Sequence, residues 1–216
     1  TRKESSAASD VYKRQLLMWI DLQQLDPSAA YKLLTSTITP RPIAWVSSLS
    51  AQGVLNLAPF SFFQMITDQP PTLMISTQHK ADGRRKDTSL NIEATRDFVV
   101  NLVPHALANE MNISAAAVPA DESEFDLARL EQAASSQIKV PRVALAPVAL
   151  ECRLSRLQPY PPENPSCEVI FAEVLAIYIN PTLLDANGMP DPYKMDLISR
   201  IGGCLLYTSD AADDSL

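Results

Sequence analysis

Cysteine, histidine and glycine are scarce in this chain of 216 residues, and each scarcity excludes a class of site. The 3 cysteines form no CxxC pair and the 2 histidines have no matching cysteine pair, so we expect neither a disulfide framework nor a bound metal. None of the 5 glycines belongs to a GxGxxG or GxxxxGK[ST] loop. Any nucleotide phosphate must therefore be bound by another arrangement.

Long hydrophobic runs and excess positive charge are also missing. No apolar run reaches the roughly 20 residues that cross a membrane, and no secretory signal follows Met18, the expected native start. The net charge of −7 disfavours nucleic acid and anionic membranes as partners, because both attract basic surfaces. We therefore predict a reduced, cytoplasmic protein with no nucleic-acid or membrane partner.

The two ends are expected to be non-native. Residues 10–15 and 204–209 can be encoded by opposite strands of one DNA element that resembles a transposon-type sequencing adapter. We therefore expect adapter-derived tails at residues 1–15 and 204–216. Residues 16–203 would form a single domain, cut short at its C-terminal end and large enough to bury about 70% of its unfolded surface.

Extended segments dominate the expected fold. Residues 43–48 and 54–58 are two short extended runs around the turn residues 50–53, which predicts a β-hairpin. Residues 143–156 and 167–179 resemble a long antiparallel pair. The polar stretch that ends at Ser136 is expected to be a surface excursion, with only Phe125, Leu127 and Leu130 as apolar anchors. Short helices are few and do not alternate regularly with strands, so we predict a mainly β protein with short helices, in which an antiparallel sheet closes into a barrel.

A cationic loop is the first candidate binding segment. Residues 80–88 hold the densest cluster of positive charge and lead into a helix start, where an N-cap hydroxyl and free N–H groups favour a phosphate. A solvated surface loop is the alternative. Arg41, held between two prolines, could reach the same anion, or it could pair with a surface carboxylate.

An aromatic cluster is the second candidate. Pro59 is expected to end the pairing of the hairpin just before residues 60–63, which with Trp45 could frame a flat ring system. Core packing is the alternative for these side chains. The sequence contains no GxSxG motif and no evident carboxylate pair, so no catalytic residue is assigned. Any redox or transfer chemistry would then depend on a cofactor.

Five segments carry a family resemblance: TPRPIAWVSSLSAQGVLNLAPFSFF (39–63), RKDTSLNIEATRDFVVNLV (85–103), LANEMNISA (107–115), EFDLARL (124–130) and PVALECRL (147–154). Together they resemble the flavin reductase-like family of FMN-binding split-barrel proteins, which includes flavoredoxins. The resemblance implies a Greek-key split β-barrel and a homodimer, with one non-covalent FMN per subunit near the dimer interface. Family members continue past Gly203, so the expected truncation bears on the dimer contacts.

The resemblance also implies an activity and a set of contacts. The expected activity is that of an NAD(P)H-dependent flavin reductase, in which hydride passes from the nicotinamide to flavin N5. The implied contacts with the flavin or its ribityl chain are Val46, Ser47, Asn56, Ala58, Ser61, Phe62 and Phe63. The implied phosphate ligands are Arg41, Lys86 and Thr88, while Asp87 would cap the helix or contact the ribityl hydroxyls.

Two alternative functions stay open. The first is a flavoredoxin-type FMN protein that transfers electrons and is reduced by a protein partner. The second is a non-redox barrel that binds an anion or a nucleic acid, although the acidic charge counts against it. The residues do not distinguish NADH from NADPH or a prosthetic flavin from a substrate flavin, and they do not identify the final electron acceptor.

Overall fold

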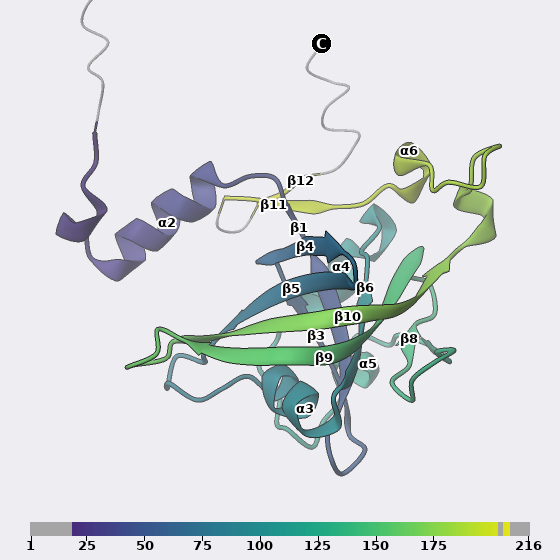
Figure 1. Cartoon of the computed structure of the whole chain (residues 1–216), viewed down its shortest axis with the longest axis horizontal. Helices are drawn as coiled ribbons and strands as arrows, with labels where there is room; N and C mark the ends of the chain where they lie inside the picture. The colour runs from purple at the N-terminus through teal and green to yellow at the C-terminus, as the bar shows by residue number, and fades with distance from the viewer. Residues whose placement is uncertain (1–18, 203–204, 208–216) are drawn as a thin grey trace, which may run out of the picture.

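The computed structural model describes residues 19–202 and 205–207 and is built on strands (Figure 1). The strands are β1 (Arg41–Pro42), β2 (Ala44–Leu49), β3 (Leu55–Phe60), β4 (Phe63–Asp68), β5 (Pro71–Gln78), β6 (Asp97–Asn101), β7 (Gln132–Ala133), β8 (Arg142–Val143), β9 (Val148–Tyr160), β10 (Cys167–Ile179), β11 (Ser199–Ile201) and β12 (Leu205–Tyr207). The α-helices are α2 (Pro27–Thr37), α3 (Asp87–Thr95), α4 (Ala108–Ile113), α5 (Glu124–Leu127) and α6 (Pro192–Met195). Short 3-10 turns are η1 (Leu22–Gln24), η2 (His105–Leu107) and η3 (Pro181–Leu183).

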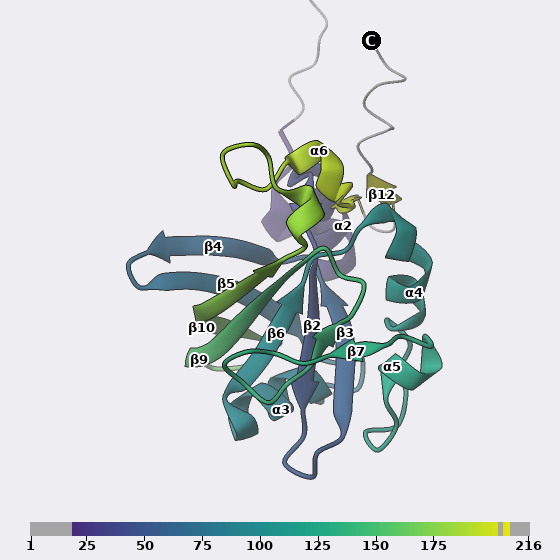
Figure 2. The ribbon, with the colours of Figure 1, turned by 90° about the vertical axis from the view of Figure 1, so that its right-hand side faces the viewer.

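Seven strands form one antiparallel sheet in the order β3-β2-β6-β9-β10-β5-β4. Figure 2 shows these strands fanning out, with α4 and α5 beside β3 and with α3 at the opposite end from β12. The long hairpin β9–β10 confirms the predicted antiparallel pair. Smaller ladders join β1 to β11, β11 to β12 and β7 to β8.

The predicted hairpin is present as β2 and β3. Gly53 adopts a positive φ of 86° in the turn, which glycine does without steric cost, and its N–H donates to the carbonyl of Ser50. The prediction that Pro59 ends the pairing is wrong, because β3 continues to Phe60 and Pro59 lies opposite Trp45. Proline is tolerated there because β3 is at the edge of the sheet, where a missing N–H breaks no ladder bond.

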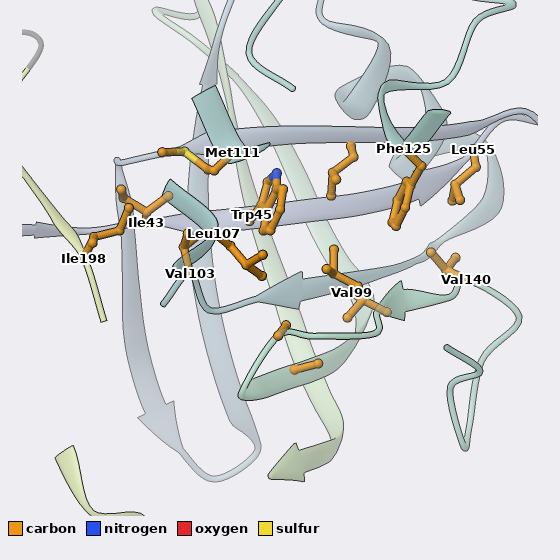
Figure 3. Close-up of a cluster of buried hydrophobic side chains, with 14 of the residues drawn as sticks. Ile43, Trp45, Leu55, Val99, Val103, Leu107, Met111, Phe125, Val140 and Ile198 are labelled. Atoms are coloured by element: carbon orange, nitrogen blue, oxygen red, sulfur yellow. The ribbon is translucent and has the colours of Figure 1, made fainter. Parts of the chain in front are cut away.

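Two hydrophobic cores form on the sheet, because successive residues of a strand face opposite sides. Trp45 belongs to one core and Val46 to the other. In the first core, Trp45 lies among side chains that include Met111 and Phe125 (Figure 3), and its Nε1 donates to Ser114 Oγ at 2.8 Å. In α5, which belongs to the stretch expected to be a surface excursion, the expected anchor Phe125 is fully buried and Leu127 is exposed. This short helix closes the core beside β3.

The N-terminal helix α2 keeps much of its apolar surface in solvent. Asp26 caps the helix by accepting from the N–H groups of Ser28 and Ala29, but Tyr31 and Leu34 remain exposed. Within residues 19–202 and 205–207, no helix is long and apolar enough to cross a membrane.

The predicted tails fall mostly outside the residues that the structure describes. These are residues 1–15, residue 204 and residues 208–216. The remaining part of the predicted C-terminal tail, Leu205–Tyr207, forms β12 and pairs with β11.

Candidate functional site

A cavity of about 620 Å³ opens between β3, the loop before α3, the segment around α4 and α5, and β11. This volume is within the range of small-molecule and cofactor sites. The lining residues are Ile43, Asn56, Ala58, Pro59, Phe60, Ser61, Lys80, Ala81, Asp82, Arg84, Lys86, Asp87, Thr88, Met111, Asn112, Ser114, Ala115, Ala116, Ala117, Val118, Glu124 and Arg200. The lining therefore combines apolar and charged side chains.

The start of α3 is the clearest anion-binding feature of the cavity. The first N–H groups of an α-helix have no intrahelical acceptor, and no side chain caps them in α3. The N-cap residue is Lys86, whose ammonium forms no ion pair among residues 19–202. A positive charge and free N–H groups thus coincide at one wall.

The expected N-cap hydroxyl is absent from this helix start. The hydroxyl of Thr88 donates to Asn56 Oδ1 at 2.7 Å, and that of Ser89 lies 2.7 Å from Thr77 Oγ1. Both hydroxyls turn toward neighbouring strands because Thr88 and Ser89 belong to the buried face of α3. The uncapped N–H groups consequently remain available to a ligand.

Most of the other cations of the predicted cluster are paired with carboxylates. Lys80 Nζ is 2.8 Å from Asp87 Oδ2, and Arg84 Nε is 2.7 Å from Asp82 Oδ2. The pKa of the Asp82 carboxyl is lowered, first because the N–H of Arg84 donates to it and second because the Arg84 guanidinium does so. The loop is therefore less positive than its composition predicts, and Lys86 is its unpaired cation in the described part of the chain.

The buried carboxylate of Glu168, on β10, anchors the cationic loop. It accepts from Arg85 Nε at 2.8 Å and lies 2.9 Å from His79 Nε2. Arg85 also pairs with Glu93, on the second turn of α3, at 2.6 Å. His79 and Arg85 bracket the loop, so β10 fixes both of its ends. Arg85 is a positioning residue here, since its Nε and Nη1 atoms bind protein carboxylates, while its buried Nη2 has no hydrogen-bond partner.

A second buried carboxylate, Glu124, holds the wall formed by β3. It accepts from Asn56 Nδ2 at 2.8 and 2.9 Å and from the N–H of Leu57 at 2.8 Å. Asn56 Oδ1 accepts in turn from Thr88, so the chain of bonds runs from α5 through β3 to the start of α3. Burial raises the pKa of Glu124 despite these hydrogen bonds. The sequence reasoning assigned no role to Glu124, although it lies in the motif EFDLARL.

Six of the predicted contacts meet at the cavity: Asn56, Ala58, Ser61, Lys86, Asp87 and Thr88. They come from β3, the residue that follows it and the first turn of α3, segments well separated along the chain. Asn56 and Ala58 share one face of β3 because strand side chains alternate with a period of two. Leu57, between them, points into the core.

Five other predicted contacts do not line the cavity. Val46 is in the second core, and the Ser47 hydroxyl donates to the carbonyl of Pro141 at 2.7 Å. The guanidinium of Arg41 donates to the carbonyls of Thr35, Ile38 and Gly202, which explains its burial. Phe62 packs edge-on against Tyr31, and Phe63 packs against the second core. Contact of these five residues with a flavin remains a prediction, and it would need their backbone atoms or a shift of the side chains.

Several lining residues were missed by the sequence reasoning. Met111 and residues 115–118 add apolar surface to the lining, and Arg200 reaches the cavity from β11. Small apolar residues carry no local signal of a binding site. Among the described residues there is no group of His, Cys, Asp and Glu that could hold a metal ion.

Comparison with known proteins identifies a family that this chain matches. The family described as "Flavin reductase like domain" matches residues 36–198. Nitrilotriacetate monooxygenase component B from Bacillus cereus is similar at a TM-score of 0.85 and 34% identity, over 89% of this chain and 95% of that one. The 2-nitrobenzoate 2-nitroreductase from Pseudomonas fluorescens is similar at a TM-score of 0.80 and 30% identity, over 89% and 92% of the two chains.

The fold class is confirmed by the same comparison. A protein from Shewanella frigidimarina with a split barrel domain is similar at a TM-score of 0.76 and 20% identity, over 89% of this chain and 96% of that one. The mainly β split barrel predicted from the sequence is thus the observed architecture. With the family match covering most of the described residues, the chain belongs to the flavin reductase like family.

Proposed function

We propose that this protein binds FMN non-covalently in the cavity beside β3 and acts as an NAD(P)H-dependent flavin reductase. The observation that carries the proposal is the meeting of Asn56, Ala58 and Ser61 with Lys86 and Thr88 around one cavity. The resemblance implied the first three as contacts with the flavin or its ribityl chain and the last two as phosphate ligands, from two separate stretches of sequence. Membership of the family and the redox names of the similar proteins support the same activity.

The chemistry of the walls fits the two ends of FMN. A dianionic phosphate suits the start of α3, where the uncapped N–H groups and the ammonium of Lys86 supply positive charge. Ala58, Pro59, Met111 and residues 115–118 offer the apolar surface that a flat ring system requires. Asp87 lines the same cavity, but Lys80 already neutralises its carboxylate.

The proposed contribution of the protein is binding and orientation. Bound FMN would supply the redox centre that accepts hydride from the nicotinamide. Thr88 and Asn56 would fix the wall between the phosphate end and the ring end, since their side chains are bonded to each other at 2.7 Å. Hydride transfer to the flavin requires no separate acid or base, so we assign no catalytic residue; Glu124 already accepts hydrogen bonds from Asn56 and Leu57.

An anaerobic titration tests the proposal. The protein is mixed with FMN, and binding is followed by quenching of flavin fluorescence. NADH or NADPH is then added while the visible flavin absorbance is recorded. We expect saturable FMN binding and bleaching with at least one nicotinamide nucleotide. No FMN binding would refute the assignment of the cavity, whereas binding without bleaching would favour the flavoredoxin-type alternative.

We also propose a homodimer, in which a second copy covers apolar surface that a monomer leaves in solvent. On α2, the exposed side chains include Tyr31 and Leu34, and on β4 they include Met65 and Ile66. Clusters of this kind are typical of protein interfaces. Light scattering after size exclusion, at several protein concentrations, measures the mass. A monomer at all concentrations would contradict this part of the proposal.

The cellular setting is proposed on the state of the cysteines. Cys152 and Cys167 are both free, which suits a reducing compartment such as the cytoplasm. Burial also raises the pKa of the Cys152 thiol far above its usual range, so this thiol is unreactive. Fluorescence microscopy of the protein fused to a tag in a bacterial host would show whether it stays in the cytoplasm.

A further inference from the structure

A second cationic side chain, that of Arg200, lines the cavity away from the start of α3. Arg200 lies on β11 and lines the same cavity as Lys86. Figure 1 shows β11 and α3 at opposite ends of the main sheet, and Figure 2 agrees for the neighbouring strand β12. The two cations therefore approach the cavity from opposite sides, and one phosphate at α3 would leave Arg200 without an anion.

The guanidinium of Arg200 is poised for a ligand. Its Nε atom is buried and has no hydrogen-bond partner, and none of the ion pairs among the described residues includes Arg200. An enclosed donor without an acceptor costs about 1–3 kcal/mol, more when the group is charged. An oxyanion that entered the cavity would supply the missing acceptor.

The neighbouring strand β1 brings a second guanidinium, that of Arg41, close to Arg200. Arg41 lies directly opposite Arg200 in the β1–β11 ladder, so their side chains leave the same face of the ribbon. The carbonyls of Ile38 and Gly202 bind Arg41 at 2.7 and 2.8 Å, and they carry only partial charge. Although Arg41 does not line the cavity, its charge on the same face of the ribbon adds to the positive potential around Arg200.

We propose that Arg200 binds an anionic oxygen group of the small molecule that exchanges electrons with the cofactor, through a charge-assisted hydrogen bond. The proposal rests on the proposed function, because it assigns FMN to the α3 end. Two sources offer this chemistry: the carboxylate of an aromatic acid and the phosphate of a nicotinamide nucleotide. A guanidinium can hold either group with two parallel N–H bonds. Ile43 and Met111, which also line the cavity, would contact the apolar part of the ligand.

Paired probes test the proposal and separate the two sources. The FMN-loaded protein is titrated with benzoate and with its neutral analogue benzamide, and then with the redox-inert tetrahydro form of nicotinamide mononucleotide and with the corresponding neutral riboside. Binding is followed by the shift of the visible flavin band. Wild type is expected to prefer one anionic probe over its neutral analogue, and Arg200→Gln to weaken that probe by about 10–100-fold while leaving the neutral analogue unchanged.

Two further variants control the measurement. Arg200→Lys keeps the charge without the two parallel donors, so it should fall between wild type and Arg200→Gln. Arg153→Gln removes the same charge from an exposed ion pair with Asp97 outside the cavity lining, and it should leave all four titrations unchanged. Thermal unfolding of each variant confirms that it is folded.

Three outcomes would overturn the proposal. Wild type could bind neither anion better than its neutral analogue, or Arg200→Gln could bind both anions like wild type. Arg200→Gln could also weaken FMN itself while both probes are unaffected, which would assign Arg200 to the cofactor phosphate. If wild type bound no FMN, the proposed function would fail separately, and calorimetric titration of the anionic probes into the apoprotein would still decide the role of Arg200.

Discussion

Glu124 and Asn56 are joined by two hydrogen bonds from one amide nitrogen, of 2.8 and 2.9 Å to the two carboxylate oxygens. The bonds connect α5 to β3 across 68 positions of sequence. They fix the direction of the amide, so that Asn56 Oδ1 faces the hydroxyl of Thr88. The wall of the cavity at β3 therefore depends on a carboxylate from a different element.

A polarity exchange tests this dependence. Asn56→Asp places two carboxylates together, and Glu124→Gln removes an acceptor, so each should lower the free energy of unfolding by about 1–3 kcal/mol and weaken FMN binding. In the double variant, the new amide at position 124 can donate to the new carboxylate at position 56, while its oxygen still accepts from the N–H of Leu57. We expect the double variant to recover at least half of both losses in urea unfolding and FMN titrations. Additive losses would show that the pair is not coupled.

The raised pKa of Glu124 predicts how stability depends on pH. Because the folded state holds this proton more tightly than the unfolded state, the contribution of Glu124 is fully present below its ordinary pKa of 4.5. It is lost as the pH rises through the raised folded pKa. The stability of wild type relative to Glu124→Gln should thus fall as the pH rises above about 4.5. Urea unfolding of both proteins from pH 4 to pH 8 measures this, and a constant difference would contradict the direction of the shift.

Lys86 and Thr88 should contribute to FMN affinity without being needed for the fold. Lys86→Ala removes the unpaired cation at the start of α3 and is expected to weaken FMN binding about tenfold, with a smaller dependence on salt. Thr88→Ala breaks the bond to Asn56 and should also weaken binding, whereas Thr88→Ser retains the hydroxyl. Lys139→Ala is the matched control, since Lys139 is exposed and outside the cavity lining. Unchanged FMN affinity in both Lys86→Ala and Thr88→Ala would show that the start of α3 does not bind FMN.

Glu168 should control the order of the cationic loop. Glu168→Gln removes the charge that faces His79 and Arg85, and we expect the free energy of unfolding to fall by about 1–3 kcal/mol. Amide hydrogen exchange in residues 79–86 should become faster, because both ends of the loop lose their anchor. Arg153→Gln is the control, as it breaks an exposed ion pair outside the loop. Equal exchange in wild type and Glu168→Gln would mean that the loop is held by other contacts.

Local signals were enough to predict the mainly β class and much of the strand pattern. The hairpin β2–β3 follows from two extended runs around Gly53, and the pair β9–β10 from two long apolar strands around a proline-rich loop. The start of α3 after a cationic loop was also evident. These features depend on residues close in sequence, where periodicity and turn chemistry act directly. The prediction that pairing ends at Pro59 was wrong, because whether a strand lies at the edge of a sheet depends on the order of all its strands.

The sequence by itself also determined that Asn56 and Ala58 would share one face of a strand, since side chains alternate along it. Only the tertiary structure decided that this face borders a cavity. It also decided that Trp45 and Val46 pack in the two hydrophobic cores and do not line that cavity. Glu124 and Arg200 reach that cavity from distant elements, and Arg41 is withdrawn from it by carbonyls of the segment around α2. The physical reason is that burial and charge pairing depend on which surfaces meet after folding, and no local pattern encodes that meeting.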